Sequence, residues 1–186
     1  MISTNLYMIM LGCTPKGRIT EQHDIFFGIG TTLQDLIPDM YTFWPEAEQQ
    51  IHIDAWQKVT QVEDFSIKVI PKAQAKEKTY QLFFINLGGY QPGQFEEFHH
   101  KLLIVATSKS EAIKKAKQTH FYQNFSFKGA VSHIDDQYGV AIDEIYDIEE
   151  ILSDKFKKEY TLNIIPGNQP PDEVHIGYLK MNKINF

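Results

Sequence analysis

The 186-residue chain has a single cysteine, Cys13. One thiol cannot form a disulfide within the chain, nor can it supply a zinc or iron–sulfur site built from several cysteines. Basic residues are also scarce, because 18 Lys and Arg stand against 24 Asp and Glu, which gives a formal net charge of −6. This balance argues against a protein dedicated to duplex binding, so we do not expect nucleic acid as a partner.

Long apolar runs are missing as well. Runs such as residues 102–106 are far shorter than the roughly 20 residues that cross a bilayer. Residues 1–11 have no basic start and no small-residue cleavage site, so we expect a cytoplasmic protein without membrane contact. Phosphate-binding glycine loops and the nucleophile elbow are absent too. The sequence therefore names no cofactor and no catalytic residue, and whether the protein is an enzyme stays open.

The chain does contain an internal repeat. At an offset of 76, residues 6–37 align without a gap on residues 82–113, and nine of the 32 positions are identical, against about two expected by chance. Ile53-Asp54 then answers Ile142-Asp143, and residues 65–71 answer residues 160–166. These matches predict a first copy at 1–71, a linker at 72–79, a second copy with insertions at 80–166, and a tail at 167–186.

Each copy reads as a ββαββ unit of the α+β class. Apolar strands are expected at 6–11 and 24–30, at 82–87 and 101–106, and again as a strand pair at 50–62 and 65–70. Thr32-x-x-Asp35 and Ser108-x-x-Glu111 resemble capping boxes that begin the helices, and Pro38 should end or kink the first helix. Residues 145–158 have helical spacing, although a strand is not excluded. Alternating apolar residues at 173–184 predict an extra edge strand.

The two copies should cover each other, since a small sheet with one helix cannot bury both of its faces. A pseudo-two-fold arrangement is the simplest solution, and a homodimer is a further possibility. A fragment of residues 1–75 is therefore expected to fold poorly or to dimerise.

Glu21-x-His23 and Glu97-x-His99 are the polar pairs that the repeat retains. Each follows a glycine-containing loop and begins a strand, where residues two apart point to the same side. Three interpretations stay open. The pairs stabilise the loop, or they line a ligand pocket with Gly12, Gly88 and Gly89, or His23 and His99 bind a metal if the two pairs meet.

The remaining polar residues carry weaker signals. His52-Ile53-Asp54 aligns with Ala141-Ile142-Asp143, so the aspartates are interpreted as architectural, bonding a turn at a strand end. His120, His133 and His175 have no matching position and are expected at the surface. Cys13 aligns with Gly89, so the loop does not need a thiol, and a catalytic cysteine is not favoured.

This order of motifs resembles the bacterial family called domain of unknown function 1543, whose domain occurs once or twice per chain. The resemblance runs through residues 6–12, 21–24 and 52–54, and again through residues 87–89 and 97–99. Two positions depart from a symmetric pattern, because Cys13 replaces the second glycine and Ala141 replaces His52. The resemblance implies a bacterial cytoplasmic protein and no particular activity.

Our leading hypothesis is a protein that binds a small molecule or a protein partner through these loops. Two alternatives stay open: a metal-dependent or acid–base enzyme with Glu21 or Glu97 as proton acceptor, and a structural or interaction module. The candidate ligand-binding residues are Gly12, Glu21, His23, Gly88, Gly89, Glu97 and His99.

Overall fold

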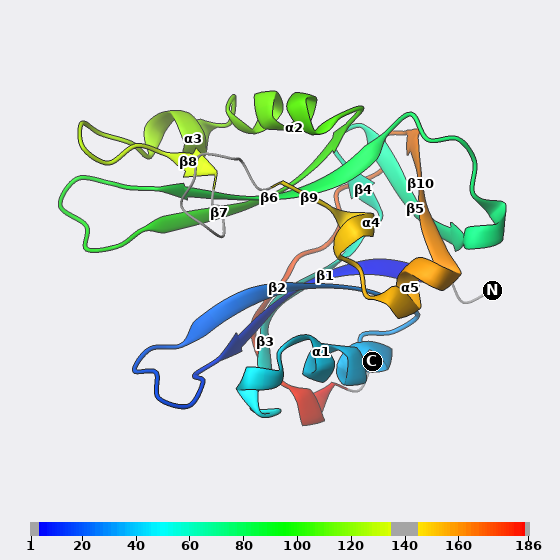
Figure 1. Ribbon diagram of the computed structural model, residues 1–186, viewed down its shortest axis with the longest axis horizontal. Helices are drawn as coiled ribbons and strands as arrows, with labels where there is room; N and C mark the ends of the chain where they lie inside the picture. The colour runs from blue at the N-terminus through cyan, green and yellow to red at the C-terminus, as the bar shows by residue number, and fades with distance from the viewer. Residues whose placement is uncertain (1–3, 135–144, 185–186) are drawn as a thin grey trace. The chain divides into compact units, whose positions relative to one another are not determined.

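The computed structural model describes residues 4–134 and 145–184 and shows an α+β protein with antiparallel sheets (Figure 1). This confirms the predicted fold class. The chain forms two compact units, one of Met1–Lys76 with Leu152–Phe186 and one of Glu77–Ile151. Residues 141–143, which the repeat aligns with residues 52–54, lie outside the described residues.

Unit 1 is built on a sheet with the strand order β11-β3-β1-β2. The predicted first strand pair forms a long hairpin, β1 (Asn5–Cys13) with β2 (Gln22–Gly30), and β3 (His52–Val59) pairs with the other edge of β1. A 3-10 turn η1 (Gln34–Leu36) and α1 (Ile37–Phe43) follow β2, and a second turn η2 (Pro45–Ala47) leads to β3. Leu6, Ile9, Leu11 and Met40 are fully buried, so this sheet and its helix share a core.

A second small sheet of unit 1 joins segments that the repeat had aligned. β4 (Gln61–Val62) pairs with β5 (Phe65–Pro71), and β5 pairs with β10 (Tyr160–Pro166). The register is symmetric, since Tyr160 lies opposite Pro71 and Phe65 lies opposite Pro166. The two aligned segments therefore pair with each other, which brings residues 152–186 into unit 1. A turn η3 (Lys72–Gln74) follows β5.

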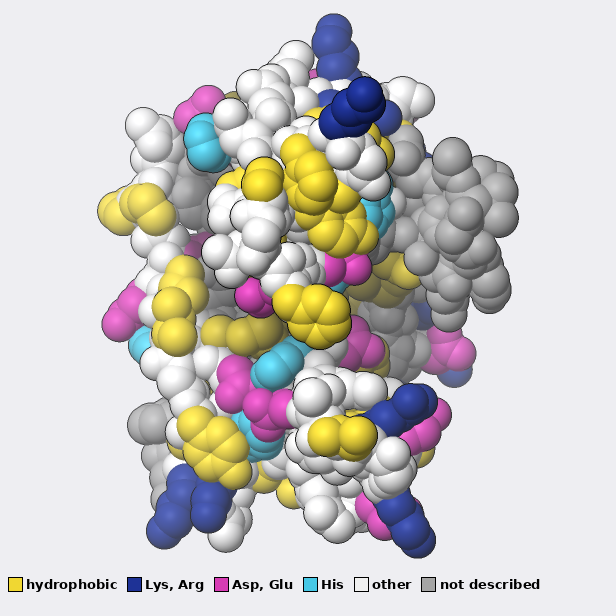
Figure 2. Space-filling view, turned by 90° about the vertical axis from the view of Figure 1, so that its left-hand side faces the viewer, with side chains coloured by type: hydrophobic (Ala, Val, Ile, Leu, Met, Phe, Trp, Pro, Cys, Tyr) yellow, Lys and Arg dark blue, Asp and Glu magenta, His cyan; other side chains and the backbone are white. Residues whose placement is uncertain are grey.

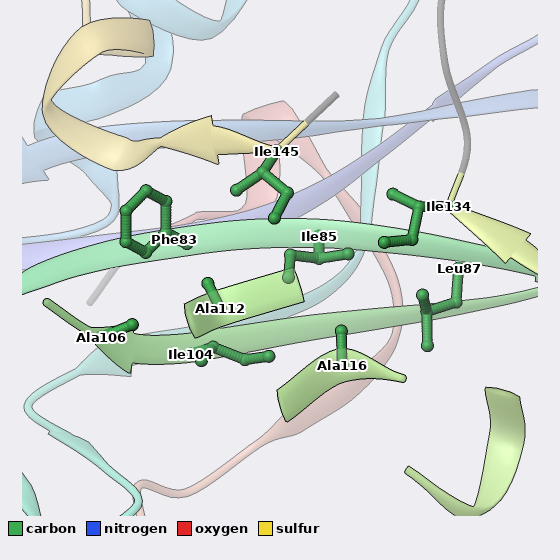
Figure 3. Packing of buried hydrophobic residues seen from close by; sticks show 9 residues of the cluster. All are labelled: Phe83, Ile85, Leu87, Ile104, Ala106, Ala112, Ala116, Ile134 and Ile145. Atoms are coloured by element: carbon green, nitrogen blue, oxygen red, sulfur yellow. The ribbon is translucent and has the colours of Figure 1, made fainter. Parts of the chain in front are cut away.

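Unit 2 has its own hairpin, β6 (Gln81–Gly89) with β7 (Phe98–Ala106). Two short strands, β8 (His133–Ile134) and β9 (Tyr146–Asp147), pair with the other edge of β6. α2 (Lys109–Ala116) lies along the hairpin, followed by α3 (His120–Asn124) (Figure 1). Ala112 and Ala116 of α2 face Ile85 and Ile104 of the sheet, so small residues let the helix pack closely (Figure 3).

The two hairpins have the same register at an offset of 76 residues. Gly12 lies opposite His23 in β1–β2, and Gly88 lies opposite His99 in β6–β7. The third strands also correspond: His52 lies opposite Gly12, and His133 lies opposite Gly88. The alignment of Ile53 with Ile142 is therefore corrected, because Ile134 occupies the position of Ile53 beside the central strand.

The starts of the two helical segments agree with the capping prediction. The Ser108 hydroxyl accepts a hydrogen bond from the Glu111 amide, and Thr32 does the same for Asp35, each at 3.3 Å. Pro38 does not end the first helix. It stands in the first turn of α1, where its missing N–H costs nothing and its fixed φ suits the helix.

Residues 145–158 contain both structures that the sequence left open. After β9 come α4 (Ile148–Ile151) and, in unit 1, α5 (Asp154–Glu159), with Ile148 and Phe156 buried as the helical spacing requires. The tail adds the expected edge strand, β11 (His175–Lys180), which pairs with β3 and precedes a last turn η4 (Met181–Lys183).

Candidate functional site

Three strands of unit 1 bring polar side chains together around Gly12. Gly12 has His23 beside it on β2 and His52 beside it on β3. A β-bulge shifts the β1–β3 register between Met10 and Leu11, so Asp54 is an extra residue without an opposite partner on β1. Bulges commonly redirect a side chain near functional sites. Here the Asp54 carboxylate reaches His23 and His52.

Gly12 provides the space for these side chains. A Cβ atom added to it would lie closer than 3.0 Å to both Asp54 Oδ2 and His52 Nε2. Any other residue would therefore displace them. Gly12, one of the candidate ligand-binding glycines, thus leaves room for two side chains of the protein.

Glu21, His23, His52 and Asp54 form one cluster, which we call the Gly12 cluster. His52 Nε2 lies 3.0 Å from Glu21 Oε1 and 3.3 Å from Asp54 Oδ2. His23 Nε2 lies 3.2 Å from the same Asp54 oxygen and 3.6 Å from Glu21 Oε2. Two imidazoles and two carboxylates thus alternate in a ring of contacts.

The inner half of the Gly12 cluster has unmet hydrogen-bonding capacity. His52 Nε2 and Asp54 Oδ2 are buried, and neither has a partner with hydrogen-bond geometry despite the short distances. The prediction that Asp54 bonds a turn is therefore wrong for this oxygen. Buried polar atoms are nearly always satisfied in folded proteins, so such a pair calls for an explanation.

The outer half of the cluster is open to solvent. The His52 and Asp54 side chains are 9% and 20% exposed, whereas those of Glu21 and His23 are 44% and 39% exposed. Histidine and acidic side chains lie next to one another on the molecular surface in Figure 2. A small ligand could therefore reach the buried pair past the outer residues.

Tyr178 packs against the cluster, and Cys13 follows Gly12 on β1. The Tyr178 ring of β11 packs on His52, with ring centroids 4.3 Å apart. Burial raises the pKa of the Cys13 thiol, and the negative charge of Glu21 raises it further. A buried thiol with a raised pKa is a poor nucleophile.

The corresponding residues of unit 2 repeat part of this arrangement. His133 Nε2 lies 3.1 Å from Glu97 Oε1, the counterpart of the His52–Glu21 contact. Glu97 also accepts a 2.7 Å hydrogen bond from the Tyr90 hydroxyl, and the Tyr90 and His133 rings stack. His133 lies at the surface as expected, but it does have a counterpart, because it stands where His52 stands in unit 1.

A sequence signal for this correspondence exists. The tripeptide His-Ile-Asp occurs at residues 52–54 and again at residues 133–135, although Asp135 lies outside the described residues. The repeat alignment instead matched Ile53-Asp54 with Ile142-Asp143, a pair that is not preceded by a histidine. Each Glu-x-His pair makes its described contacts within its own unit.

Gly89 has a packing role. A Cβ atom on it would lie 2.8 Å from the Phe125 carbonyl oxygen and Cβ, so an aromatic segment fills the space beside this glycine. The other two expected surface histidines differ: His120 is exposed, whereas the half-buried His175 stacks on Trp56 with ring centroids 3.8 Å apart.

Comparison with known proteins gives a family match for the segment that carries the Gly12 cluster. A family model described as Domain of Unknown Function (DUF1543) matches residues 18–69, which include all four cluster residues. A protein Il1583 from Idiomarina loihiensis has a similar crystal structure, with a TM-score of 0.58 and 20% identity over 96% of this chain and 98% of that chain. This similarity concerns the fold alone. No curated protein matches the chain.

Two further observations concern residues 4–134 and 145–184. No helix there is both long and apolar enough to span a membrane. As the side chains stand, no group of three or more His, Cys, Asp or Glu there could hold a metal ion.

Proposed function

We propose that the chain binds a small polar ligand at the Gly12 cluster. The observation that supports this most directly is the pair of buried, unpartnered atoms, His52 Nε2 and Asp54 Oδ2. Leaving a buried polar group unsatisfied costs about 1–3 kcal/mol. A ligand that offers a partner to both atoms recovers this cost, so the protein alone is destabilised at this point and the complex is not.

Access and selectivity come from different halves of the cluster. The half-exposed Glu21 and His23 stand at the entrance, while His52 and Asp54 lie below them. The carboxylates accept hydrogen bonds, and the imidazoles can donate or accept. The site therefore favours small ligands that carry a positive charge or a hydrogen-bond donor.

Unit 2 supplies a second candidate site of the same kind. Glu97, His99 and His133 take the positions of Glu21, His23 and His52, with Gly88 in the position of Gly12. Because the Tyr90 hydroxyl already donates to Glu97, we expect the second site to bind more weakly than the first.

A thermal-shift screen of the full chain against amines, polyols, amino acids and divalent salts tests the proposal. We expect at least one compound to raise the melting temperature of the wild type and to lose this effect in Asp54→Asn, which keeps the side-chain shape. Asp24→Asn is the matched control, since Asp24 lies in the same segment and accepts its hydrogen bond from the neighbouring Ile25 amide. Equal shifts in both variants and the wild type would contradict the proposal.

A further inference from the structure

We propose that the ligand of the Gly12 cluster is a divalent first-row transition-metal cation, an inference that rests on the proposed function. Two imidazole nitrogens and two carboxylates make up the cluster, and this donor set suits Zn²⁺, Fe²⁺, Mn²⁺ and Co²⁺. Neutral imidazoles with two carboxylates carry a charge of −2, which a divalent ion balances.

The separations between donor atoms fit a shared ion. Ligand atoms about 2.1 Å from a metal lie roughly 3.0–3.4 Å apart at neighbouring octahedral or tetrahedral corners. Three of the four nitrogen–oxygen contacts fall at 3.0, 3.2 and 3.3 Å, and the fourth, between His23 and Glu21, is 3.6 Å. Glu21 and His23, which make the longest contact, would therefore have to move for all four side chains to bind one ion.

Hydrogen-bond geometry separates this interpretation from an ordinary ion-pair network. In an ion pair, a protonated His52 would direct its Nε2–H at one of the two carboxylates. Both carboxylates lie within 3.3 Å of Nε2, yet neither meets the geometry of a hydrogen bond with it. The buried Nε2 is therefore left without a hydrogen-bond partner inside the protein, and a bound cation would satisfy its lone pair.

As the side chains stand, no group of three or more His, Cys, Asp or Glu in the described part of the chain could hold a metal ion, so binding requires the cluster to rearrange. The inner ligands are fixed, because His52 is buried under the Tyr178 ring. The outer Glu21 and His23 are exposed enough to rotate. We therefore expect His52 and Asp54 to bind the ion first and the outer residues to close over it.

Cobalt titration of the chelator-treated full chain tests this inference, because Co²⁺ bound to nitrogen and oxygen donors absorbs visible light without any enzymatic assay. The wild type should show saturable visible bands, and Zn²⁺ should displace them. Asp54→Asn and His52→Gln should each lower the affinity of this site for Co²⁺ at least tenfold, and so reduce the bound cobalt by up to one equivalent. Even changes outside the ligand shell cause about this loss of affinity. Glu21→Gln and His23→Gln give the same readout if a buried variant fails to fold.

Two controls make the result specific to this cluster. Glu97→Gln should leave the equivalent held by unit 1 intact, because Glu97 belongs to unit 2. His175→Gln removes a half-buried histidine outside the cluster and should change nothing.

The inference is overturned if the wild type binds no Co²⁺ or Zn²⁺ in a saturable manner, or if binding survives in all four cluster variants. Repeating the thermal-shift screen with a chelator present separates the two claims. An organic ligand that still acts through Asp54 would refute the cation and preserve the binding site, whereas failure of both assays would refute both.

Discussion

At the scale of single residues, one glycine and one bulged aspartate determine the site. Gly12 leaves room for two side chains, and the bulge in β3 carries Asp54 without an opposite residue on β1. Glu21 and His23 were predictable, because both copies of the repeat retain them. Asp54 and His52 were not, since a bulge and a contact across strands depend on pairing between distant segments, which the local sequence pattern does not determine.

Gly12→Ala tests the role of the glycine. The added Cβ would displace the His52 ring and the Asp54 carboxylate, so ligand binding should be lost and stability lowered by about 1–3 kcal/mol. Urea unfolding and the thermal-shift assay measure the two effects. Cys13→Ala, on the opposite face of β1, should lower stability but keep binding. Retained binding in Gly12→Ala would contradict the assigned role.

At the scale of elements, the local signals for helix starts were reliable. Asp35 accepts hydrogen bonds from the Thr31 and Thr32 amides, and Glu111 accepts from the Thr107 amide and hydroxyl. Capping depends on residues within one turn, which is why sequence spacing found it. Pro38 was misjudged because the α-helix begins at Ile37, after the turn η1, rather than directly after Thr32 as the capping motif suggests.

The decrease of the free energy of unfolding at acidic pH should reveal the hydrogen bonds that Asp35 accepts. The hydrogen bond from the Thr32 amide is the main cause that lowers the pKa of Asp35. A lowered folded-state pKa adds stability above the unfolded-state pKa, and this is lost as pH falls through the folded-state pKa. Asp35→Asn should therefore be less stable than the wild type at neutral pH and equal to it in strong acid. A difference in urea unfolding that persists unchanged into acid would contradict this.

Asp172 anchors the segment that precedes β11. Its carboxylate accepts hydrogen bonds from the Thr60 amide at 2.7 Å and the Gln61 amide at 2.9 Å, and also from the Thr60 hydroxyl. Hydrogen bonds to a charged group contribute about 1.5–3 kcal/mol each. Asp172→Ala should lower the free energy of unfolding by about 2–3 kcal/mol and loosen β11 over His52. Glu173→Ala, at an exposed neighbour, should change the free energy of unfolding far less in the same unfolding experiment.

At the scale of the whole molecule, the strands were predictable but their partners were not. Apolar runs separated by glycine-containing loops in residues 6–30 and 82–106 identified both hairpins. The pairing of β5 with β10 joins residues about 95 positions apart, and nothing within either segment specifies it. For this reason the compact units divide the chain differently from the repeat. We propose that duplication of one ancestral module explains the equal hairpin registers and the symmetric β5–β10 pair.

A fragment of residues 1–75 tests this account of the architecture. It lacks β10 and β11, so β5 keeps only the two-residue β4 as a neighbour. Because β5 and β10 are aligned by the repeat, a second β5 should substitute for β10. We expect a dimer, or a poorly folded monomer, by size-exclusion chromatography with light scattering and by circular dichroism. A stable, folded monomer would contradict the account.

The most direct test of the central claim is anomalous X-ray diffraction from crystals of the full chain prepared with Zn²⁺. The account predicts an anomalous peak between His52 Nε2 and Asp54 Oδ2, with Glu21 and His23 turned toward it. Crystals that bind zinc only elsewhere on the protein, with His52 Nε2 and Asp54 Oδ2 still next to only each other, Glu21 and His23, would contradict it.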